Sequence, residues 1–265
     1  MTTTSTKVTN RLTQLFEKKN KGLLNIYFTA GFPKLDDTIS IIKALEEAGA
    51  DMIEIGMPYS DPLADGPTIQ ESNMAALNNG MTLKVLFTQL AELRKVTNIP
   101  VLLMGYLNPV IQYGVEKFCK EAAACGVDGV IVPDLPLDEY ISEYKELFEA
   151  NNLSNVFLVT PHTSEKRIRL IDENTQGFIY IVSTDSTTGN AKDITGAEAY
   201  FKKISALKLK SPAMIGFNVK DNASYTFASQ YANGAIIGSA FIKMLKESKD
   251  LKGDISGFVK MVKGV

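Results

Sequence analysis

The side chains best placed for acid–base chemistry in this sequence are carboxylates on and just after one apolar segment. Glu54 stands inside the run Ile53–Gly56, and burial raises a carboxyl pKa toward the range in which one group can both give and take a proton. The alternative is a structural glutamate paired with a lysine or a backbone amide. The following segment, 57–67, carries Asp61 and Asp65 among three prolines and a glycine. The residues alone do not choose between these two aspartates, and either could simply cap local backbone.

The chain has one histidine, His162, so chemistry that needs two or three imidazoles is excluded. It follows the apolar run 156–160, where it could touch a ligand, although an exposed loop histidine needs no role. Cys119 and Cys125 are six residues apart in an apparent helix, which places them about 9 Å apart and beyond disulfide reach. Neither belongs to a Cys-x-x-Cys pair, so we predict buried, free cysteines and no metal site.

Composition narrows the class of protein further. The 265 residues include 28 Lys and Arg against 30 Asp and Glu, a net charge of −2, which excludes a strongly basic nucleic-acid binder. The apolar stretch 23–32 is too short to span a bilayer, which needs about 20 residues, and residues 1–7 lack the apolar core of a secretion signal. We therefore expect a cytoplasmic protein with neither a nucleic-acid nor a membrane partner.

Eight apolar runs rich in Val, Ile and Leu recur along the chain, and most do not alternate with polar residues, as in strands buried on both faces of a parallel sheet. Helical patterns lie between them. This order predicts an α/β fold, a single (β/α)8 barrel domain over 1–265, in which an N-terminal extension (1–20) holds a helix near 9–19 that could plug the barrel. A doubly wound sheet is less favoured, because it more often has five or six strands and no Gly-x-Gly-x-x-Gly follows the first run. The expected strands are Leu23–Thr29, Met52–Gly56, Val101–Met104, Gly129–Val132, Val156–Thr160, Phe178–Val182, Ala213–Phe217 and Ala235–Gly238.

Local signals mark where several helices begin and end. Gly49, Gly126 and Gly234 each follow an expected helix and precede a strand, so each is predicted to form a left-handed helix cap. Thr68–Glu71 has the pattern of a capping box and is predicted to open the helix after segment 57–67.

A barrel places its site at the carboxyl ends of its strands, often with a phosphate near the last two. Small residues with available backbone amides follow the sixth, seventh and eighth runs, in 183–189, 216–218 and 238–239. Together they predict a phosphate-binding site, although three ordinary tight turns would give the same sequence pattern. Tyr180, inside the sixth run, is a core residue unless it points toward the barrel mouth.

The run Ile53–Gln70 closely resembles the signature of the tryptophan synthase α-subunit family, and the resemblance continues through 27–31, 104–109, 133–136 and 238–239. It implies a (β/α)8 barrel that splits indole-3-glycerol phosphate into indole and glyceraldehyde 3-phosphate without a cofactor of its own. It also implies a pyridoxal-phosphate β subunit as partner, in an α2β2 heterotetramer, to which indole passes through a tunnel.

The resemblance also assigns roles to single residues. Glu54 matches the general acid–base glutamate, and Asp65 matches the aspartate that hydrogen-bonds the indole N–H. Asp61 falls where the family's loop meets the partner subunit. The remaining implied residues are Tyr27, Met104, Tyr180 and Phe217 for the indole pocket, Gly189, Asn218, Gly238 and Ser239 for phosphate, Thr188 for loop closure, and Asn108 and Pro109 for the partner interface.

Two departures from the family pattern keep alternatives open. Segment 183–189 lacks the arginine and the first glycine that are common there, and Asn218 replaces a glycine. Asparagine tolerates a positive φ, so its amide could still point at phosphate. The alternatives are a lyase that acts alone and releases free indole, and a mainly non-catalytic activator of a β subunit.

Overall fold

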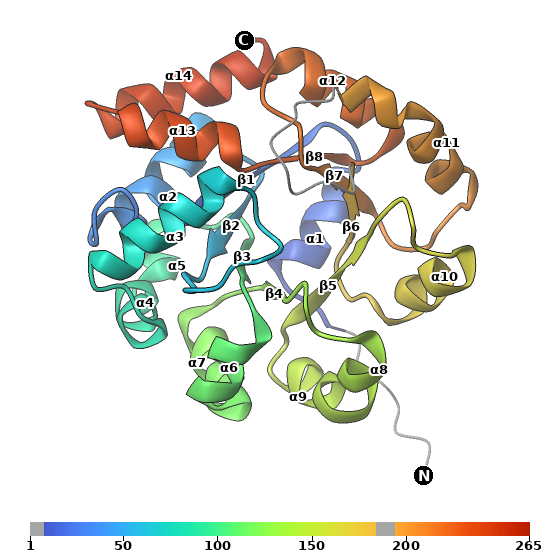
Figure 1. Ribbon diagram of the computed structural model, residues 1–265, viewed down its shortest axis with the longest axis horizontal. Coiled ribbons are helices and arrows are strands. Elements are labelled where there is room, and N and C mark those ends of the chain that lie inside the picture. Colours follow the sequence, from blue (N-terminus) through green and yellow to red (C-terminus); the bar gives the residue numbers. More distant parts are fainter. Residues whose placement is uncertain (1–7, 184–193) are drawn as a thin grey trace.

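The strands form a closed parallel barrel in which each pairs with the next and β8 returns to β1 (Figure 1). The computed structural model describes residues 8–183 and 194–265. All eight expected strands are present, with ends that differ by at most two residues, and the predicted fold class is confirmed. The strands are β1 (Leu23–Thr29), β2 (Met52–Gly56), β3 (Val101–Met104), β4 (Gly129–Ile131), β5 (Ser154–Val159), β6 (Ile179–Val182), β7 (Ala213–Gly216) and β8 (Gly234–Ile237).

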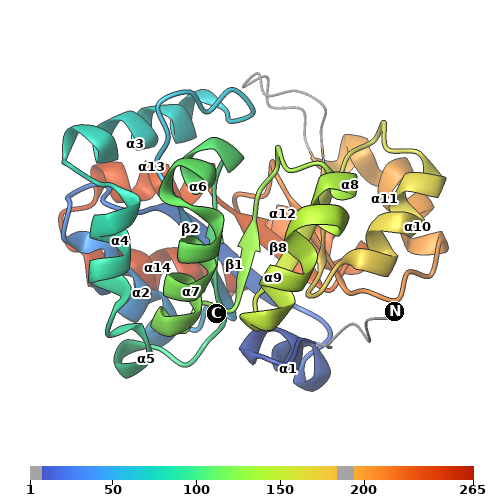
Figure 2. The same cartoon turned by 90° about the horizontal axis from the view of Figure 1, so that it is seen from below.

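Helices surround the barrel, and Figure 2 shows α1 at the end opposite α3. A π-helical turn (Tyr140–Tyr144) joins α8 to α9, and a 3-10 turn (Ile194–Ala197) precedes α11. The helices are α1 (Arg11–Lys18), α2 (Asp37–Ala48), α3 (Pro67–Asn78), α4 (Leu83–Leu90), α5 (Leu93–Val96), α6 (Leu107–Tyr113), α7 (Val115–Cys125), α8 (Leu137–Glu139), α9 (Lys145–Ala150), α10 (Glu165–Asn174), α11 (Glu198–Ala206), α12 (Asn222–Tyr231), α13 (Ser239–Glu247) and α14 (Leu251–Lys263).

Apolar side chains pack in two layers, one between strands and helices and one inside the barrel. Leu12 of α1 is fully buried and belongs to the inner layer. The predicted N-terminal helix therefore does close the barrel base. The inner layer consists of Leu12, Leu23, Met52, Leu102, Ile131, Val156, Phe178, Tyr180, Val182, Met214 and Ile236.

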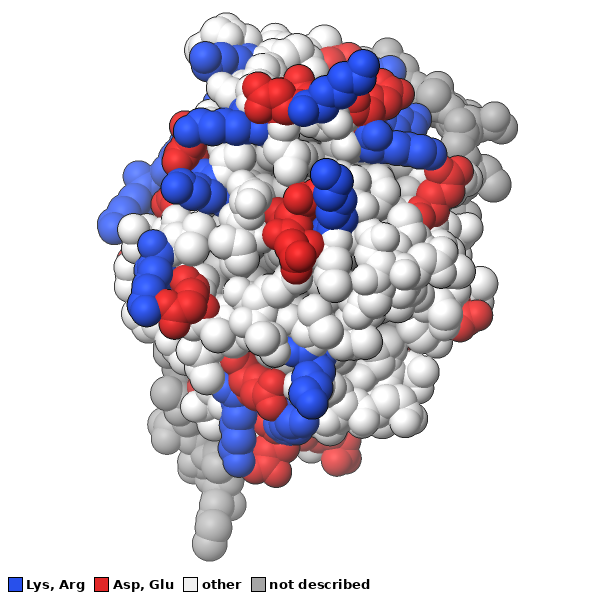
Figure 3. All heavy atoms as spheres, turned by 90° about the vertical axis from the view of Figure 1, so that its left-hand side faces the viewer, with Lys and Arg blue, Asp and Glu red and all other residues white. Residues whose placement is uncertain are grey.

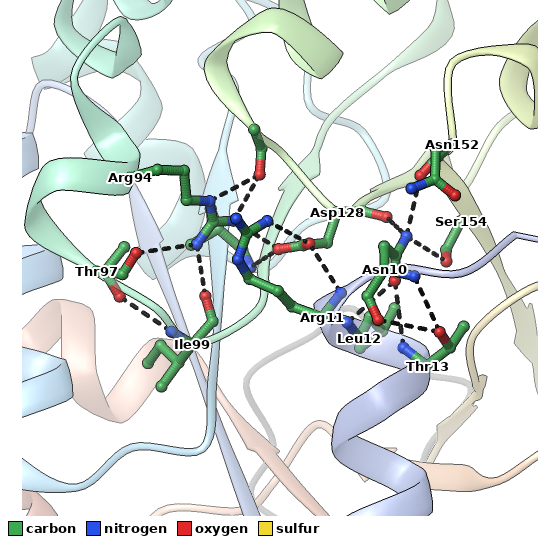
Figure 4. A network of polar contacts seen from close by, with 12 residues as sticks. Asn10, Arg11, Leu12, Thr13, Arg94, Thr97, Ile99, Asp128, Asn152 and Ser154 are labelled. Atoms are coloured by element: carbon green, nitrogen blue, oxygen red, sulfur yellow. Dashed lines mark hydrogen bonds and ion pairs between the residues drawn. The ribbon is translucent and has the colours of Figure 1, made fainter.

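A buried polar network holds α1 in this position (Figure 4). The Asn10 side chain caps α1 by accepting from the amides of its first turn, and its Nδ2 donates to the carbonyl oxygen of Asp128 at 2.6 Å. The Asp128 carboxylate, only 1% exposed, pairs with Arg94 at 2.5 Å and with Arg11 at 3.3 Å. A buried carboxylate needs such partners because its desolvation is unfavourable, so the network fixes α1 to the barrel base.

Two of the three predicted glycine caps are confirmed and the third is wrong. Gly49 and Gly126 end α2 and α7 with φ of 92° and 83°, in the left-handed region. Gly234 instead begins β8, where an added Cβ would lie 2.0 Å from the Leu23 carbonyl oxygen. Glycine is required there because two strand backbones approach closely.

The predicted capping box at Thr68–Glu71 is also wrong. The helix α3 begins at Pro67 with Gly66 as its N-cap, and no side chain caps it. Proline suits the first helical position because its φ is already helical and its missing N–H has no intrahelical acceptor there.

Cys119 and Cys125 both lie in α7 and are buried and free, as predicted. Charges of both signs are interspersed on the face shown in Figure 3. Ion pairs between helices include Lys246–Glu71 and Lys252–Glu47, each at 2.9 Å. Within residues 8–183 and 194–265, no helix is long and apolar enough to cross a membrane.

Candidate active site

A cavity of about 300 Å³ opens at the carboxyl ends of the strands. Four residues expected at the site, Tyr27, Asp65, Met104 and Phe217, line it, and so does His162. The other lining residues are Met57, Ala64, Asn73, Gly105, Tyr106, Pro133, Leu158, Thr160 and Val182. Most of these are apolar, so the cavity suits a flat apolar ring held by a few polar groups.

Glu54 lies on β2, directly beside Tyr27 of β1 and Leu102 of β3 in the strand register. Its side chain is fully buried and does not line the cavity. Its Oε1 accepts a hydrogen bond of 2.6 Å from Asn25 Nδ2. Burial raises the pKa of Glu54 to about 8, although the Asn25 hydrogen bond lowers it. The carboxyl is therefore neutral at pH 7 and within reach of ionisation.

Asp65 lies in the β2–α3 loop and faces the cavity. Its Oδ2 accepts a 3.0 Å hydrogen bond from Tyr106 Oη, which also accepts from the Ala64 amide. Its own backbone carbonyl accepts from Gln70 Nε2 at 2.8 Å. Burial raises the pKa of Asp65 to about 6, and the Tyr106 hydrogen bond lowers it. Asp65 is therefore ionised at pH 7.

The structure separates the two aspartates that the sequence could not distinguish by itself. Asp61 is exposed, and Leu63 close by is 84% exposed. Asn108, at the start of α6, is also exposed and lies 3.5 Å from Tyr59 Oη through its Nδ2. The β2–α3 loop and α6 therefore adjoin, and they bring the expected partner-contact residues, including Pro109, to one part of the surface.

Two glycines make room for tyrosine rings in the barrel interior. A Cβ on Gly56 would lie 2.1 Å from Tyr27 Oη, and one on Gly216 would lie 2.2 Å from Tyr180 Oη. Tyr180 is buried and does not line the cavity, but its ring stands edge-on to that of Phe217 with centroids 6.2 Å apart. Tyr180 therefore lies behind the cavity wall and supports Phe217.

The ends of β7 and β8 carry the residues expected to bind phosphate. Phe217 and Asn218 both adopt left-handed backbone, with φ of 66° and 57°, and the Ser183 hydroxyl holds this turn by donating to the Phe217 carbonyl oxygen at 2.8 Å. The tolerance of Asn218 for a positive φ, inferred from the sequence, is confirmed. Consecutive left-handed residues are unusual outside glycine, so a specific backbone shape is enforced here.

Gly238 and Ser239 stand at the N-terminus of α13. The first amides of a helix have no intrahelical acceptor and favour anions. A Cβ on Gly238 would lie 3.3 Å from the ring of Tyr27, so this helix start adjoins the cavity wall. Thr188 and Gly189, expected for loop closure and phosphate, lie outside the described residues.

Sequence reasoning missed Tyr106 and Asn25 as site residues. Tyr106 stands within segment 104–109, which carried a family resemblance, and its position after β3 was a usable signal. Asn25 had only one signal, a polar residue inside an apolar strand.

Two carboxyl groups in different environments are the chemical core of this arrangement. Glu54 is fully buried and its pKa is raised to about 8, so it favours the neutral form, whereas Asp65 lines the cavity with a pKa of about 6 and favours the ionised form. Such a pair can donate a proton to an apolar substrate with one group and stabilise the resulting positive charge with the other.

Comparisons with known proteins agree on one family. The family model described as tryptophan synthase alpha chain matches residues 13–262. The tryptophan synthase alpha chain of Flavobacterium psychrophilum is 54% identical over 240 residues, covering 90% of this chain and 94% of that protein. That of Flavobacterium johnsoniae is 53% identical and covers 94% and 98%. The crystal structure of tryptophan synthase subunit alpha from Legionella pneumophila superposes with a TM-score of 0.88 at 31% identity and covers 97% and 98%.

Proposed function

The chain belongs to the tryptophan synthase alpha chain family, and we propose that Glu54 is its general acid–base group and that Asp65 holds the indole N–H. As a member it is a lyase that cleaves indole-3-glycerol phosphate in tryptophan biosynthesis and works with a β subunit. The observation that carries the proposal is the contrast between Glu54, which is fully buried beside Asn25, and Asp65, which lines the cavity and accepts a hydrogen bond from Tyr106.

The reaction needs both groups because indole is a poor leaving carbanion. The Glu54 O–H bond breaks as a proton moves to indole C3, which makes the ring a cationic indolenine. The Glu54 carboxylate then takes the proton of the glycerol hydroxyl next to the ring, the carbon–carbon bond breaks, and its electron pair returns to the ring. Each transfer is worth about 10²–10⁴-fold in rate. Asp65, ionised beside the ring N–H, stabilises the positive charge.

The other residues bind and orient the substrate. Tyr27, Met104 and Phe217 would surround the indole ring, with Tyr180 supporting them from behind. Amides at Asn218, Gly238, Ser239 and Gly189 would take the phosphate, and the loop at Thr188 would close over the site and exclude water.

We further propose one domain over residues 1–265, a cytoplasmic enzyme and an α2β2 assembly with the β subunit. Asp61, Asn108 and Pro109 would contact that partner. The exposure of Asp61 and Asn108, and the position of all three residues on adjoining segments at the cavity end of the barrel, support this assignment.

The test is an assay of indole release from indole-3-glycerol phosphate by the full chain, alone and with a β subunit. Glu54→Gln should reduce kcat by at least about 10²-fold, because glutamine has no proton to transfer, and Asp65→Asn should also lower the rate. Asp61→Asn is the matched control, and it should leave the rate of the isolated chain unchanged.

Three results would redirect the proposal. A full rate for Glu54→Gln would remove Glu54 from the acid–base role. Full activity with no gain from a β subunit would favour a lyase that acts alone. No cleavage by the wild type together with normal activation of the β subunit would favour a non-catalytic activator.

A further inference from the structure

Asn25 makes the one hydrogen bond that the structure gives to the carboxyl group of Glu54 within its described residues. It lies on β1, two residues before Tyr27, and its register partner on β2 is Met52, two residues before Glu54. Both polar side chains are fully buried, and the layer around Asn25 is otherwise formed by apolar residues such as Leu23 and Met52. Burying an amide among apolar side chains is unfavourable unless the amide is hydrogen-bonded, and the partner of this amide is the Glu54 carboxyl group.

The two oxygens of Glu54 are unequal. Oε1 accepts from Asn25 Nδ2 at 2.6 Å, while Oε2 has no hydrogen-bond partner in the described part of the chain. The hydroxyl oxygen of a neutral carboxyl group is the weaker acceptor, so the oxygen that faces the amide N–H is the carbonyl oxygen. The acidic proton then belongs on the other oxygen.

We propose that Asn25 is a positioning residue for Glu54, and that by occupying Oε1 it makes Oε2 the oxygen that carries the proton to the substrate and takes one back. The inference rests on the acid–base role proposed for Glu54. Without Asn25, the proton could reside on either oxygen and the carboxyl group could rotate, so only part of the population would hold the proton where it can be transferred.

The groups that face Glu54 do not compete for this role. Tyr27 from β1 and Tyr180 from β6 are the titratable neighbours whose pKa values respond to its charge, and burial raises both pKa values, so both hydroxyls stay neutral. Its register neighbour on β3, Leu102, is apolar. A substitution of Asn25 should therefore appear directly as a change in the pKa of Glu54.

The first experiment uses Asn25→Leu, which has a similar volume and no donor, in the full chain. Carbon-13 NMR of glutamate Cδ, with Glu54→Gln to identify the resonance, measures the Glu54 midpoint. Leucine removes the donor that stabilises the carboxylate, so the midpoint should rise. We expect a rise of about one pH unit, which corresponds to the free energy that a hydrogen bond to a charged group contributes. In cleavage assays kcat should fall about 10- to 100-fold. KM should change little, because Asn25 does not line the cavity. The pH at which the rate falls on the alkaline side should move to a higher value.

Two further variants separate positioning from folding. Asn155→Leu is the matched control, because Asn155 is also buried on a strand with an unpaired Oδ1 but faces the helices, as its alternation with the inward Val156 shows. It should leave the Glu54 midpoint unchanged. Asn25→Asp keeps the shape of asparagine and should raise the midpoint further, since two adjacent carboxyl groups resist ionising together. It tests the inference even where Asn25→Leu fails to fold.

An unchanged or lowered Glu54 midpoint in both Asn25 variants would overturn the inference. A lowered midpoint would mean that the amide accepts the Glu54 proton through Oδ1 instead of donating to Oε1. A fall in kcat with an unmoved midpoint would reduce Asn25 to a structural residue. Full activity of Glu54→Gln would instead defeat the proposed function, while the NMR titration would still decide whether Asn25 controls the Glu54 proton.

Discussion

Replacing Glu54 by glutamine should change how the stability of this protein depends on pH. Burial raises the pKa of Glu54 from its ordinary value of 4.5 to about 8. The folded chain therefore holds this proton more tightly than the unfolded chain. The resulting stabilisation is complete below pH 4.5 and is lost as the pH rises toward 8.

The size of this effect follows from the two pKa values. They differ by about 3.5, and about 1.4 kcal/mol for each tenfold change in the proton equilibrium makes the loss about 5 kcal/mol. That is a large share of the roughly 5–15 kcal/mol that stabilises a typical domain. Glutamine has nearly the same shape and no charge, so Glu54→Gln should not lose this stability. Its free energy of unfolding relative to wild type should therefore grow by about 5 kcal/mol between about pH 4 and pH 9.

Urea unfolding followed by far-ultraviolet circular dichroism measures this directly, and the method suits a chain without tryptophan. Asp65→Asn is the matched control, because burial raises the pKa of Asp65 from 3.8 to about 6. Its gain should fall between those two pH values and reach about 3 kcal/mol. If the wild-type and Glu54→Gln stability curves ran parallel from about pH 4 to pH 9, the reasoning that places a neutral acid inside the barrel would be refuted.

Three further predictions concern the pH dependence of cleavage, the packing at Gly56 and the network around Asp128. The rate of cleavage should rise as Asp65 ionises near pH 6 and fall as Glu54 ionises near pH 8, and initial rates that still climbed above pH 8 would contradict this. Gly56→Ala should lower the free energy of unfolding by about 1–3 kcal/mol through overpacking, since the new Cβ would lie 2.1 Å from Tyr27 Oη. Adding Tyr27→Phe should recover part of that loss in urea unfolding. Arg94→Met should lower the free energy of unfolding by about 3–5 kcal/mol, because the buried carboxylate of Asp128 loses its main partner. An unchanged melting temperature would contradict the role of this network in holding α1.

Local sequence determined the elements of this protein with little help from the rest of the chain. Strands buried on both faces are nearly continuous apolar runs, so eight runs rich in Val, Ile and Leu predicted eight strands that the structure confirms. The caps at Gly49 and Gly126 were equally predictable, because a left-handed backbone favours glycine. Gly234 was misread because its need for glycine comes from Leu23, more than two hundred residues away.

The choice between the two aspartates shows where local reasoning stopped. Asp61 and Asp65 stand four residues apart in one loop, and only the family resemblance of 53–70 distinguished them beforehand. In the structure, Tyr106 from beyond β3 binds Asp65 and draws it to the cavity, while Asp61 stays exposed. A contact between residues 41 positions apart leaves no periodic or compositional trace.

The sequence by itself determined the strands, their order and, through its resemblance to a family, the reaction. The tertiary structure decided the protonation states on which the proposed chemistry depends. Closure of the barrel buries Glu54 completely and sets Asn25 against it, whereas Asp65 remains at the cavity wall with a hydroxyl donor. Desolvation and hydrogen bonding set a carboxyl pKa, and both depend on strand register and stagger around the barrel, which no single segment encodes.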